Sequence, residues 1–153
     1  MNPVSSILTA QEIPHTLFRH PGEVRSLAQA AEERRQQPEQ VVRSLLFRLS
    51  ATDFVMVLVS GERQIPWAQL RRYLKQRRIT MASREEVPQV TGYIPGTVSP
   101  VGKPDDLRLL IDECVLSQEE LSIGSGEKNS TVILKTADLL RAVGDYERVN
   151  FFD

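Results

Sequence analysis

The chain has 153 residues, of which 41% are hydrophobic, and its 19 basic and 20 acidic side chains leave a formal charge of −1. This length and composition predict one globular domain, residues 1–153, and the balanced charge excludes a general basic surface, so we expect no DNA partner. One cysteine and two histidines exclude an intramolecular disulfide and a cysteine-rich zinc site, and we expect neither a metal nor another cofactor.

The chain carries no pattern that points to a membrane. No stretch reaches the apolar length of a membrane span, and the first eleven residues lack the basic and apolar regions of a secretion signal. We therefore expect a soluble cytoplasmic protein. No repeat, low-complexity segment or linker divides the sequence.

Capping residues and apolar spacing predict the elements of the first half. Asn2 followed by Pro3 is typical of a helix start and predicts a helix to about residue 11. A short strand at 16–19 follows, and then Ser26 is predicted to cap an alanine-rich helix from 27 to about 35. Residues 41–49 and 54–59 form the clearest strands, joined by a hairpin-length connection, and the second is apolar on both faces, which indicates burial inside a layered structure.

The second half continues as alternating helices and strands. Apolar residues at helical spacing predict an amphipathic helix from 67 to about 77. Ser83 and Glu86 have the spacing of a capping box, which predicts a short helix ending near Pro88. Strands are predicted at 107–111, 121–123 and 131–134, and a last helix, capped by Thr136, is expected to end at Gly144.

The segment 91–102, rich in glycine and proline, is the most informative for function. Three glycines and two prolines in twelve residues suit neither a helix interior nor a central strand. Glycine permits positive φ and the close approach of another group to the main chain. The segment predicts a stiff loop whose backbone N–H groups point at a ligand carbonyl or oxyanion; a tight structural turn is the alternative.

Arg43 is a charged residue inside an apolar predicted strand. Period-2 alternation places it on one face with Val41, Leu45 and Phe47. A guanidinium stays protonated, so it cannot act as a general base, but it can bind phosphate or ribose oxygens or stabilise developing negative charge. The alternative is an arginine whose stem packs at the sheet margin while its charge reaches water.

A basic cluster lies near the end of the predicted helix 67–77. Arg71, Lys75 and Arg78 share one side at helical spacing i, i+4 and i+7. This side is compatible with a small patch for RNA phosphates. The alternative is a solvated helix face whose positive charges favour the helix C-terminus.

Three segments together resemble the YbaK/prolyl-tRNA-editing domain family, the free-standing relatives of the insertion domain in bacterial prolyl-tRNA synthetases. Residues 40–47, with Arg43 followed by Ser and Leu, correspond to a strand in which family members have a lysine followed by Ser or Thr and Leu. Residues 91–102 contain the family's Gly-x-x-x-Pro loop as Gly96 to Pro100, and residues 122–126 precede a matching strand and helix. The resemblance extends from about residue 14 to about residue 140.

The resemblance implies an α+β fold, with a mixed, barrel-like β-sheet and flanking helices. It also implies hydrolysis of the ester between a wrong amino acid and tRNA, without a metal. The expected partner is the 3′ end of aminoacyl-tRNA, and a synthetase is a second candidate. Arg43 and Gly96 are the implied catalytic residues. The implied substrate-binding residues are His20, Thr97, Val98, Ser99, Pro100, Gly124, Ser125 and Gly126.

Two positions depart from the family pattern. Arg43 stands where the family usually has lysine, and this exchange is not conservative at a tight site. Thr131 stands where one cysteine-clearing subgroup carries an acid. The predicted function is an aminoacyl-tRNA deacylase that acts in trans. The alternatives are a non-catalytic module that binds aminoacyl-tRNA or a synthetase, with a degenerate site at Arg43, and a hydrolase of another small acyl ester.

Overall fold

The computed structural model describes residues 1–152, and its helices are short. None of the described helices is long and apolar enough to span a membrane. They are α1 Pro3–Ala10, α2 Leu27–Glu33, α3 Trp67–Leu74, α4 Glu86–Thr91, α5 Glu113–Leu116 and α6 Thr136–Val143, with the 3₁₀ turn η1 Pro38–Gln40 between α2 and the first long strand.

The described strands form two sheets, with the orders β1-β7-β6 and β4-β2-β3-β5-β8. The pairs β3–β5 and β5–β8 are parallel, and the other pairs are antiparallel. An isolated parallel bridge between Val41 and Ser122 connects the two sheets where β2 begins. The strands are β1 Thr16–Arg19, β2 Val42–Arg48, β3 Phe54–Ser60, β4 Thr80–Met81, β5 Arg108–Asp112, β6 Glu120–Gly124, β7 Ser130–Lys135 and β8 Glu147–Val149.

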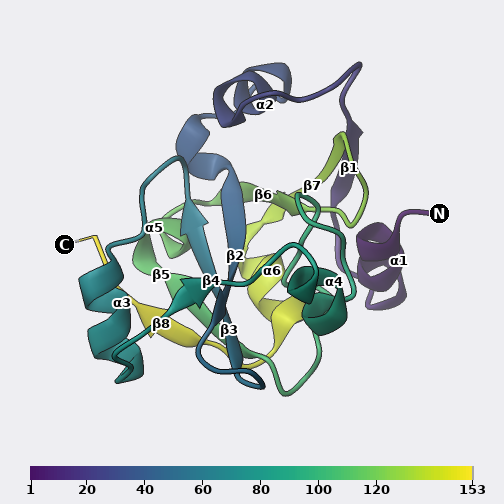
Figure 1. The fold of residues 1–153 in the computed structure, drawn as a ribbon. Coiled ribbons are helices and arrows are strands. Elements are labelled where there is room, and N and C mark those ends of the chain that lie inside the picture. The colour runs from purple at the N-terminus through teal and green to yellow at the C-terminus, as the bar shows by residue number, and fades with distance from the viewer. Residues whose placement is uncertain (153) are drawn as a thin grey trace.

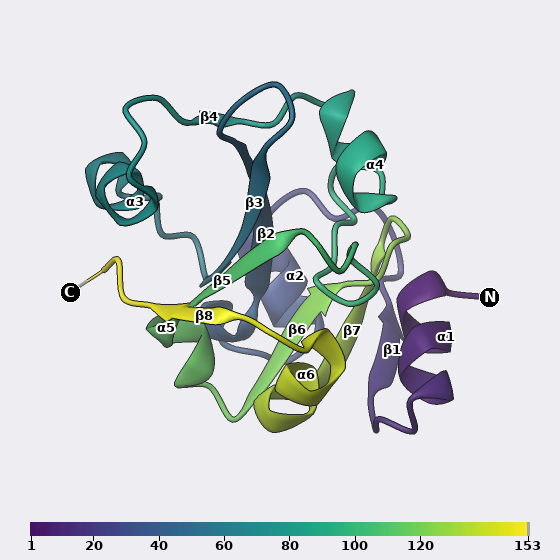
Figure 2. The same cartoon turned by 90° about the horizontal axis from the view of Figure 1, so that it is seen from below.

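This arrangement confirms the predicted α+β class with a mixed sheet and flanking helices. In Figures 1 and 2, α1 lies beside β1, and α3 lies at the opposite side of the molecule, near the C-terminal segment. The sheets are not closed into a barrel, because within residues 1–152 the larger sheet ends at the short strands β4 and β8, which do not pair with the smaller sheet.

Strand β3 is the centre of the core, as its apolar sequence predicts. Met56 and Leu58 point into one apolar cluster, which β6, β7, α1 and α6 complete. Val55, Val57 and Val59 point into a second cluster with residues of α3. All five side chains are fully buried. A strand buried on both faces holds its antiparallel neighbour β2, and with it Arg43, in a rigid position.

The capping residues in the sequence correctly predicted the starts of two helices and the end of a third. The Oδ1 atom of Asn2 accepts from the N–H of Ser5 at 2.9 Å, and Ser26 Oγ accepts from the N–H of Gln29 at 3.0 Å, so both predicted caps are confirmed. Gly144 ends α6, as predicted.

The predicted end of the helix that begins at residue 67 is wrong. Helix α3 ends at Leu74, because Lys75 adopts a left-handed conformation with φ of 57° and its N–H turns back to carbonyls of the last turn. Arg78 therefore does not continue the helical side that begins at Arg71.

Two further details differ from the prediction. The capping box of Ser83 and Glu86 forms, but α4 continues through Pro88 to Thr91. Pro88 lies in the first turn, where its missing N–H has no partner to lose. Thr136 is the first residue of α6 and not its cap, because its hydroxyl donates to the carbonyl of Gln118.

Candidate active site

Two cavities meet between the start of β2, residues 96–98 and the end of β6, and together they form the cleft described below. Their volumes are about 390 Å³ and 310 Å³. The residues that line both are Val42, Arg43, Gly96 and Gly124. The structure thus brings the two predicted catalytic residues, Arg43 and Gly96, and one predicted substrate-binding glycine to the same cleft.

The 96–98 loop packs on the 124–126 turn through main-chain groups. The N–H of Gly126 donates to the carbonyl oxygen of Thr97 at 3.0 Å, and the Val98 carbonyl lies against Gly124. Because these peptides are trans, the N–H groups of Val98 and Ser99 point away from the turn. No residue in 1–152 accepts a hydrogen bond from the N–H groups of Gly96, Val98 or Ser99. The loop therefore presents unused donors, and Gly96 and Val98 line the cleft.

The polar side chains of the loop face the protein interior. Thr97 is 1% exposed and donates to the carbonyl of Ile94, and Ser99 is fully buried and accepts from the N–H of Val101. Pro100 is buried as well. These three predicted substrate-binding residues thus shape the loop from within.

Only the first residue of the 124–126 turn lines the cleft. Ser125 is fully buried, and its Oγ contacts Ser130 Oγ at 2.7 Å and accepts from the N–H of Glu127. Gly126 has φ of +85° and lies against Pro3, which leaves no room for a side chain. Ser125 and Gly126 hold the turn, and Gly124 faces the loop and the cleft.

Arg43 reaches the cleft, but its guanidinium is engaged. Its Nε donates to the carbonyl of Gly61 at 2.8 Å, and a terminal nitrogen donates to the carbonyl of Arg63. Partial burial lowers the pKa of Arg43, and the carboxylate of Glu62 opposes this effect. The side chain thus fastens the segment after β3 and places a positive charge at the cleft.

His20 lines the larger cavity without offering a free nitrogen. Its side chain is 2% exposed. Nδ1 bonds Glu33 Oε1 at 2.6 Å, and Nε2 lies 3.2 Å from a terminal nitrogen of Arg34. Sequence reasoning missed Arg34, because nothing in the sequence distinguishes it from the exposed Arg35 beside it.

Two buried hydroxyls of the cleft lack partners. Ser122 Oγ, on β6, and Ser44 Oγ, on β2, make no hydrogen bond to residues 1–152. Ser122 is 1% exposed and lines the larger cavity, and Ser44 lines the smaller one. Sequence reasoning missed Ser122 as a site residue, although a serine between Leu121 and Ile123 interrupts an apolar run.

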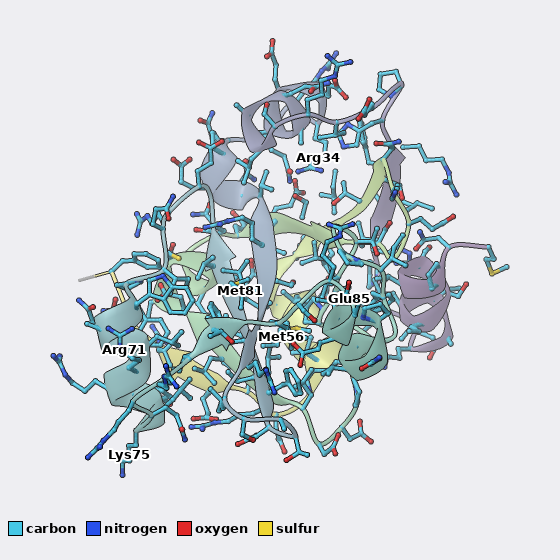
Figure 3. All side chains as sticks on the ribbon, in the orientation of Figure 1. Arg34, Met56, Arg71, Lys75, Met81 and Glu85 are labelled. Atoms are coloured by element: carbon cyan, nitrogen blue, oxygen red, sulfur yellow. The ribbon has the colours of Figure 1, made fainter. Side chains whose placement is uncertain are left out.

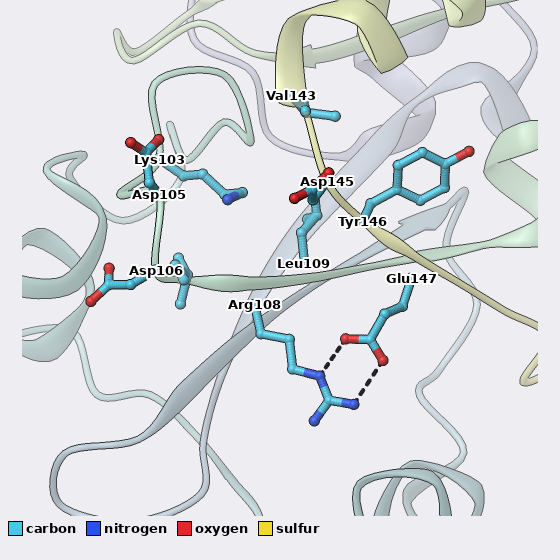
Figure 4. A pocket seen from close by; sticks show the side chains of 11 residues that line it. Lys103, Asp105, Asp106, Arg108, Leu109, Val143, Asp145, Tyr146 and Glu147 are labelled. Atoms are coloured by element: carbon cyan, nitrogen blue, oxygen red, sulfur yellow. Dashed lines mark hydrogen bonds and ion pairs between the residues drawn. The ribbon is translucent and has the colours of Figure 1, made fainter.

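The basic cluster near α3 is remote from the cleft. Arg71, Lys75 and Arg78 do not line either cavity of the cleft, and Figure 3 shows Arg71 and Lys75 at α3 on the left, away from Arg34 at the top. A separate cavity of about 350 Å³ lies between residues 103–109 and 143–147, where a two-contact ion pair joins Arg108 and Glu147 (Figure 4). No group of three or more metal-ligating side chains occurs in the described part of the chain.

Comparisons with known proteins identify a matching family and several relatives. The profile of the family described as "Aminoacyl-tRNA editing domain" matches residues 21–142. A proline–tRNA ligase of Kosmotoga olearia is 34% identical over 108 residues, which cover 71% of this chain and 18% of the ligase. The Multifunctional Ser/Thr-tRNA deacylase ProXp-y of Escherichia coli K12 is 32% identical over 98 residues, which cover 63% of this chain and 58% of the deacylase. The matches thus span less than two thirds of either relative.

Two solved structures with the same fold cover 100% and 95% of the chain. One, described as a candidate trans-editing enzyme for prolyl-tRNA synthetase, superposes with a TM-score of 0.84 at 22% identity and covers 100% of this chain and 99% of its own. Another, the hypothetical protein APE2540, superposes with a TM-score of 0.82 at 23% identity over 95% of this chain and 96% of its own. At this level of identity the likeness concerns the fold.

Proposed function

Because this chain belongs to the aminoacyl-tRNA editing domain family, we propose that it is a deacylase that hydrolyses, in trans, the ester of mischarged tRNA. The observation that carries the proposal is that Gly96 and Val98 line the cleft and that their N–H groups have no acceptor within residues 1–152. Such donors suit the carbonyl oxygen of an ester.

The proposed reaction needs little from side chains. Water attacks the ester carbonyl carbon, negative charge builds on the carbonyl oxygen, and the N–H groups of Gly96 and Val98 stabilise it. The bond to the ribose oxygen then breaks, that oxygen takes a proton, and free amino acid and tRNA leave. An aminoacyl ester is already activated, so positioning and oxyanion stabilisation are sufficient. Arg43 adds a fixed positive charge at the cleft.

The preferred substrate in this proposal carries a hydroxyl on its amino acid. The unpartnered hydroxyls of Ser44 and Ser122 are buried at the cleft wall, so each must rotate toward the cleft to donate to or accept from such a group. A buried hydroxyl without a partner costs free energy until it is satisfied, which favours that rotation. Serine and threonine carry such a hydroxyl, and the relative from E. coli is named as a Ser/Thr-tRNA deacylase.

The proposed partner is the 3′ end of aminoacyl-tRNA, with the cluster of Arg71, Lys75 and Arg78 near α3 as a contact for tRNA phosphates. A synthetase is a further proposed partner, since several relatives are proline–tRNA ligases. A second candidate function is a non-catalytic module that binds aminoacyl-tRNA. The engaged guanidinium of Arg43 favours it, because a cation held by two carbonyls is less free to contact a substrate.

Release of labelled amino acid from charged tRNA tests the proposal. The chain is incubated with tRNA for proline charged with serine, threonine, alanine or proline, and each rate is compared with spontaneous hydrolysis. We expect acceleration for the seryl and threonyl esters and none for the prolyl ester. Binding of the charged tRNA without acceleration of any ester would instead establish the non-catalytic module.

A further inference from the structure

Arg34 is a half-buried cation on the wall of the larger cavity. It follows α2 directly, and Figure 3 shows it between that helix and the strands below. Burial lowers the pKa of Arg34 to about 10, although the carboxylate of Glu33 opposes this effect. Neither of its two hydrogen-bond partners is a carboxylate: they are Gln36 Oε1 at 3.3 Å and His20 Nε2 at 3.2 Å. No carboxylate within residues 1–152 forms an ion pair with it.

His20 fixes the direction of this guanidinium. An arginine nitrogen can only donate, so His20 Nε2 must accept from it, and the ring proton must then lie on Nδ1. Nδ1 donates to Glu33 Oε1 at 2.6 Å. The result is an ordered series, Glu33 to His20 to Arg34, in which His20 is a positioning residue. This explains why a histidine on the cavity wall has a side chain that is only 2% exposed.

The guanidinium retains donors that have no acceptor within residues 1–152. It has five N–H groups, and the two contacts to His20 and Gln36 engage two of them. The one carboxylate that lines the larger cavity among the described residues, Glu127, already accepts from Asn2 Nδ2 at 2.6 Å. The other cation of the cleft, Arg43, is held by main-chain carbonyls. The larger cavity is thus lined by two guanidinium groups and one carboxylate, and no ion pair within residues 1–152 engages Arg34.

We propose that Arg34 binds the phosphate of the 3′-terminal nucleotide of aminoacyl-tRNA while the ester lies at Gly96. This inference rests on the proposed function. In aminoacyl-tRNA the nearest anion to the ester is that terminal phosphodiester, and the planar guanidinium matches two phosphate oxygens at once. Arg34 and Gly96 line the same cavity, as the phosphate and the ester of one bound nucleotide require.

Small esters with and without the phosphate test the assignment. The substrates are the seryl ester of adenosine and the same ester of adenosine 5′-monophosphate. The variants are Arg34→Gln and, as a matched control, Arg35→Gln, which removes the same charge from the exposed neighbour. We expect Arg34→Gln to lower kcat/KM for the phosphorylated ester by roughly 10- to 100-fold, the value of a charge-assisted hydrogen bond, and to leave the unphosphorylated ester within about twofold. Arg35→Gln should change neither. Equal losses on both esters, or no loss on either, would overturn the proposal.

Binding measured without hydrolysis separates this site from the proposed function. Titration with adenosine 5′-monophosphate and with adenosine should show tighter binding of the phosphorylated form by wild-type protein, and Arg34→Gln should remove that preference. If the preference depends on Arg34 but no ester is hydrolysed, the phosphate site stands and the deacylase proposal fails. If esters are hydrolysed and both nucleosides bind equally, the phosphate site fails alone.

The same titration tests the positioning role of His20. His20→Asn should lose most of the preference for the phosphorylated form, because its short amide cannot reach Arg34. In His20→Gln the side-chain carbonyl can still accept from Arg34, so more of the preference should survive. Thermal unfolding of both variants reports any general loss of structure. Equal preferences in wild-type, Asn and Gln proteins would overturn the positioning role.

Discussion

A Cβ atom on Gly124 would lie 2.1 Å from the carbonyl oxygen of Val98, so β6 and the 96–98 loop touch through their backbones at the cleft. Real Cβ atoms do not approach an oxygen this closely, and the neighbour is main chain that cannot rotate away. Only glycine at position 124 therefore allows the loop to lie where Gly96 and Val98 line the cleft.

Gly124→Ala should displace the 96–98 loop. We expect it to reduce the free energy of unfolding by about 1–3 kcal/mol, the cost of overpacking, and to slow deacylation. Gly22→Ala is the matched control, because a Cβ at the exposed Gly22 meets nothing within 4 Å. Chemical denaturation and single-turnover hydrolysis of both variants make the comparison. A Gly124→Ala protein with the stability and rate of Gly22→Ala would contradict the close contact.

Gly96 has φ of +88°, and a Cβ there would meet nothing within 4 Å, since the position opens on the cleft. Gly96→Val should lower the rate of the chemical step by about 10²–10³, the loss expected when one oxyanion donor is blocked or displaced. Gly92→Val shares the positive φ and the open surroundings but lies outside the cleft lining, so it isolates the effect of backbone strain. Similar rates for the two variants at similar stability would make the 96–98 loop a structural turn.

Features decided by neighbouring residues could be predicted from the sequence. The caps at Asn2 and Ser26 depend on hydrogen bonds within three residues, and the burial of β3 follows from a run of apolar side chains. Strand β4 could not be predicted, because its two residues are extended only through pairing with β2 at Phe47 and Arg48. The left-handed Lys75 that ends α3 has no local signature either.

The same division holds for the candidate site. Gly96 and Gly124 were predictable, since glycine itself signals an unusual backbone or a close approach. The engagement of His20 was not, because its partners Glu33 and Arg34 reach it only after α2 folds back over the strands. Whether a serine such as Ser122 has a partner also depends on tertiary packing, and sequence alone does not reveal it.

Arg43 can contribute by holding the segment after β3 or by placing a positive charge at the cleft, and two substitutions separate these roles. Arg43→Ala removes both the positive charge and the bonds to the carbonyls of Gly61 and Arg63, so we expect a strong loss of deacylation. Arg43→Lys keeps the positive charge and introduces the residue that the family resemblance implies at this strand position, so we expect it to retain or raise activity. Rates and unfolding midpoints are measured for both. Full activity in Arg43→Ala would remove Arg43 from the catalytic machinery.

Ser122→Ala separates a structural from a functional role of this hydroxyl, because we expect it to leave stability unchanged or higher and to slow hydrolysis of the seryl ester. Removing a buried hydroxyl without a partner relieves a desolvation cost, so stability should be unchanged or higher. If the hydroxyl serves the substrate, hydrolysis of seryl-tRNA should slow by roughly tenfold relative to alanyl-tRNA, because one buried hydrogen bond is lost. The ratio of the two rates is the measurement. An unchanged ratio would assign the polar specificity to other groups.

The basic cluster near α3 makes a prediction about salt dependence. Lys75 and Arg78 are exposed and Arg71 is half-buried. None of the three lines the cleft, so these side chains can affect tRNA binding without touching the ester. Each phosphate contact that is lost should flatten the slope of log affinity against log salt by roughly 0.7–0.9.

The triple variant with alanine at positions 71, 75 and 78 should therefore bind tRNA more weakly at low salt and show a shallower slope. Hydrolysis of the seryl ester of adenosine should stay within about twofold of wild type, because that substrate has no tRNA body to contact these side chains. Binding across a salt series for both proteins decides the matter. Identical slopes would contradict the tRNA contact and would mean that Arg71, Lys75 and Arg78 form an ordinary solvated surface.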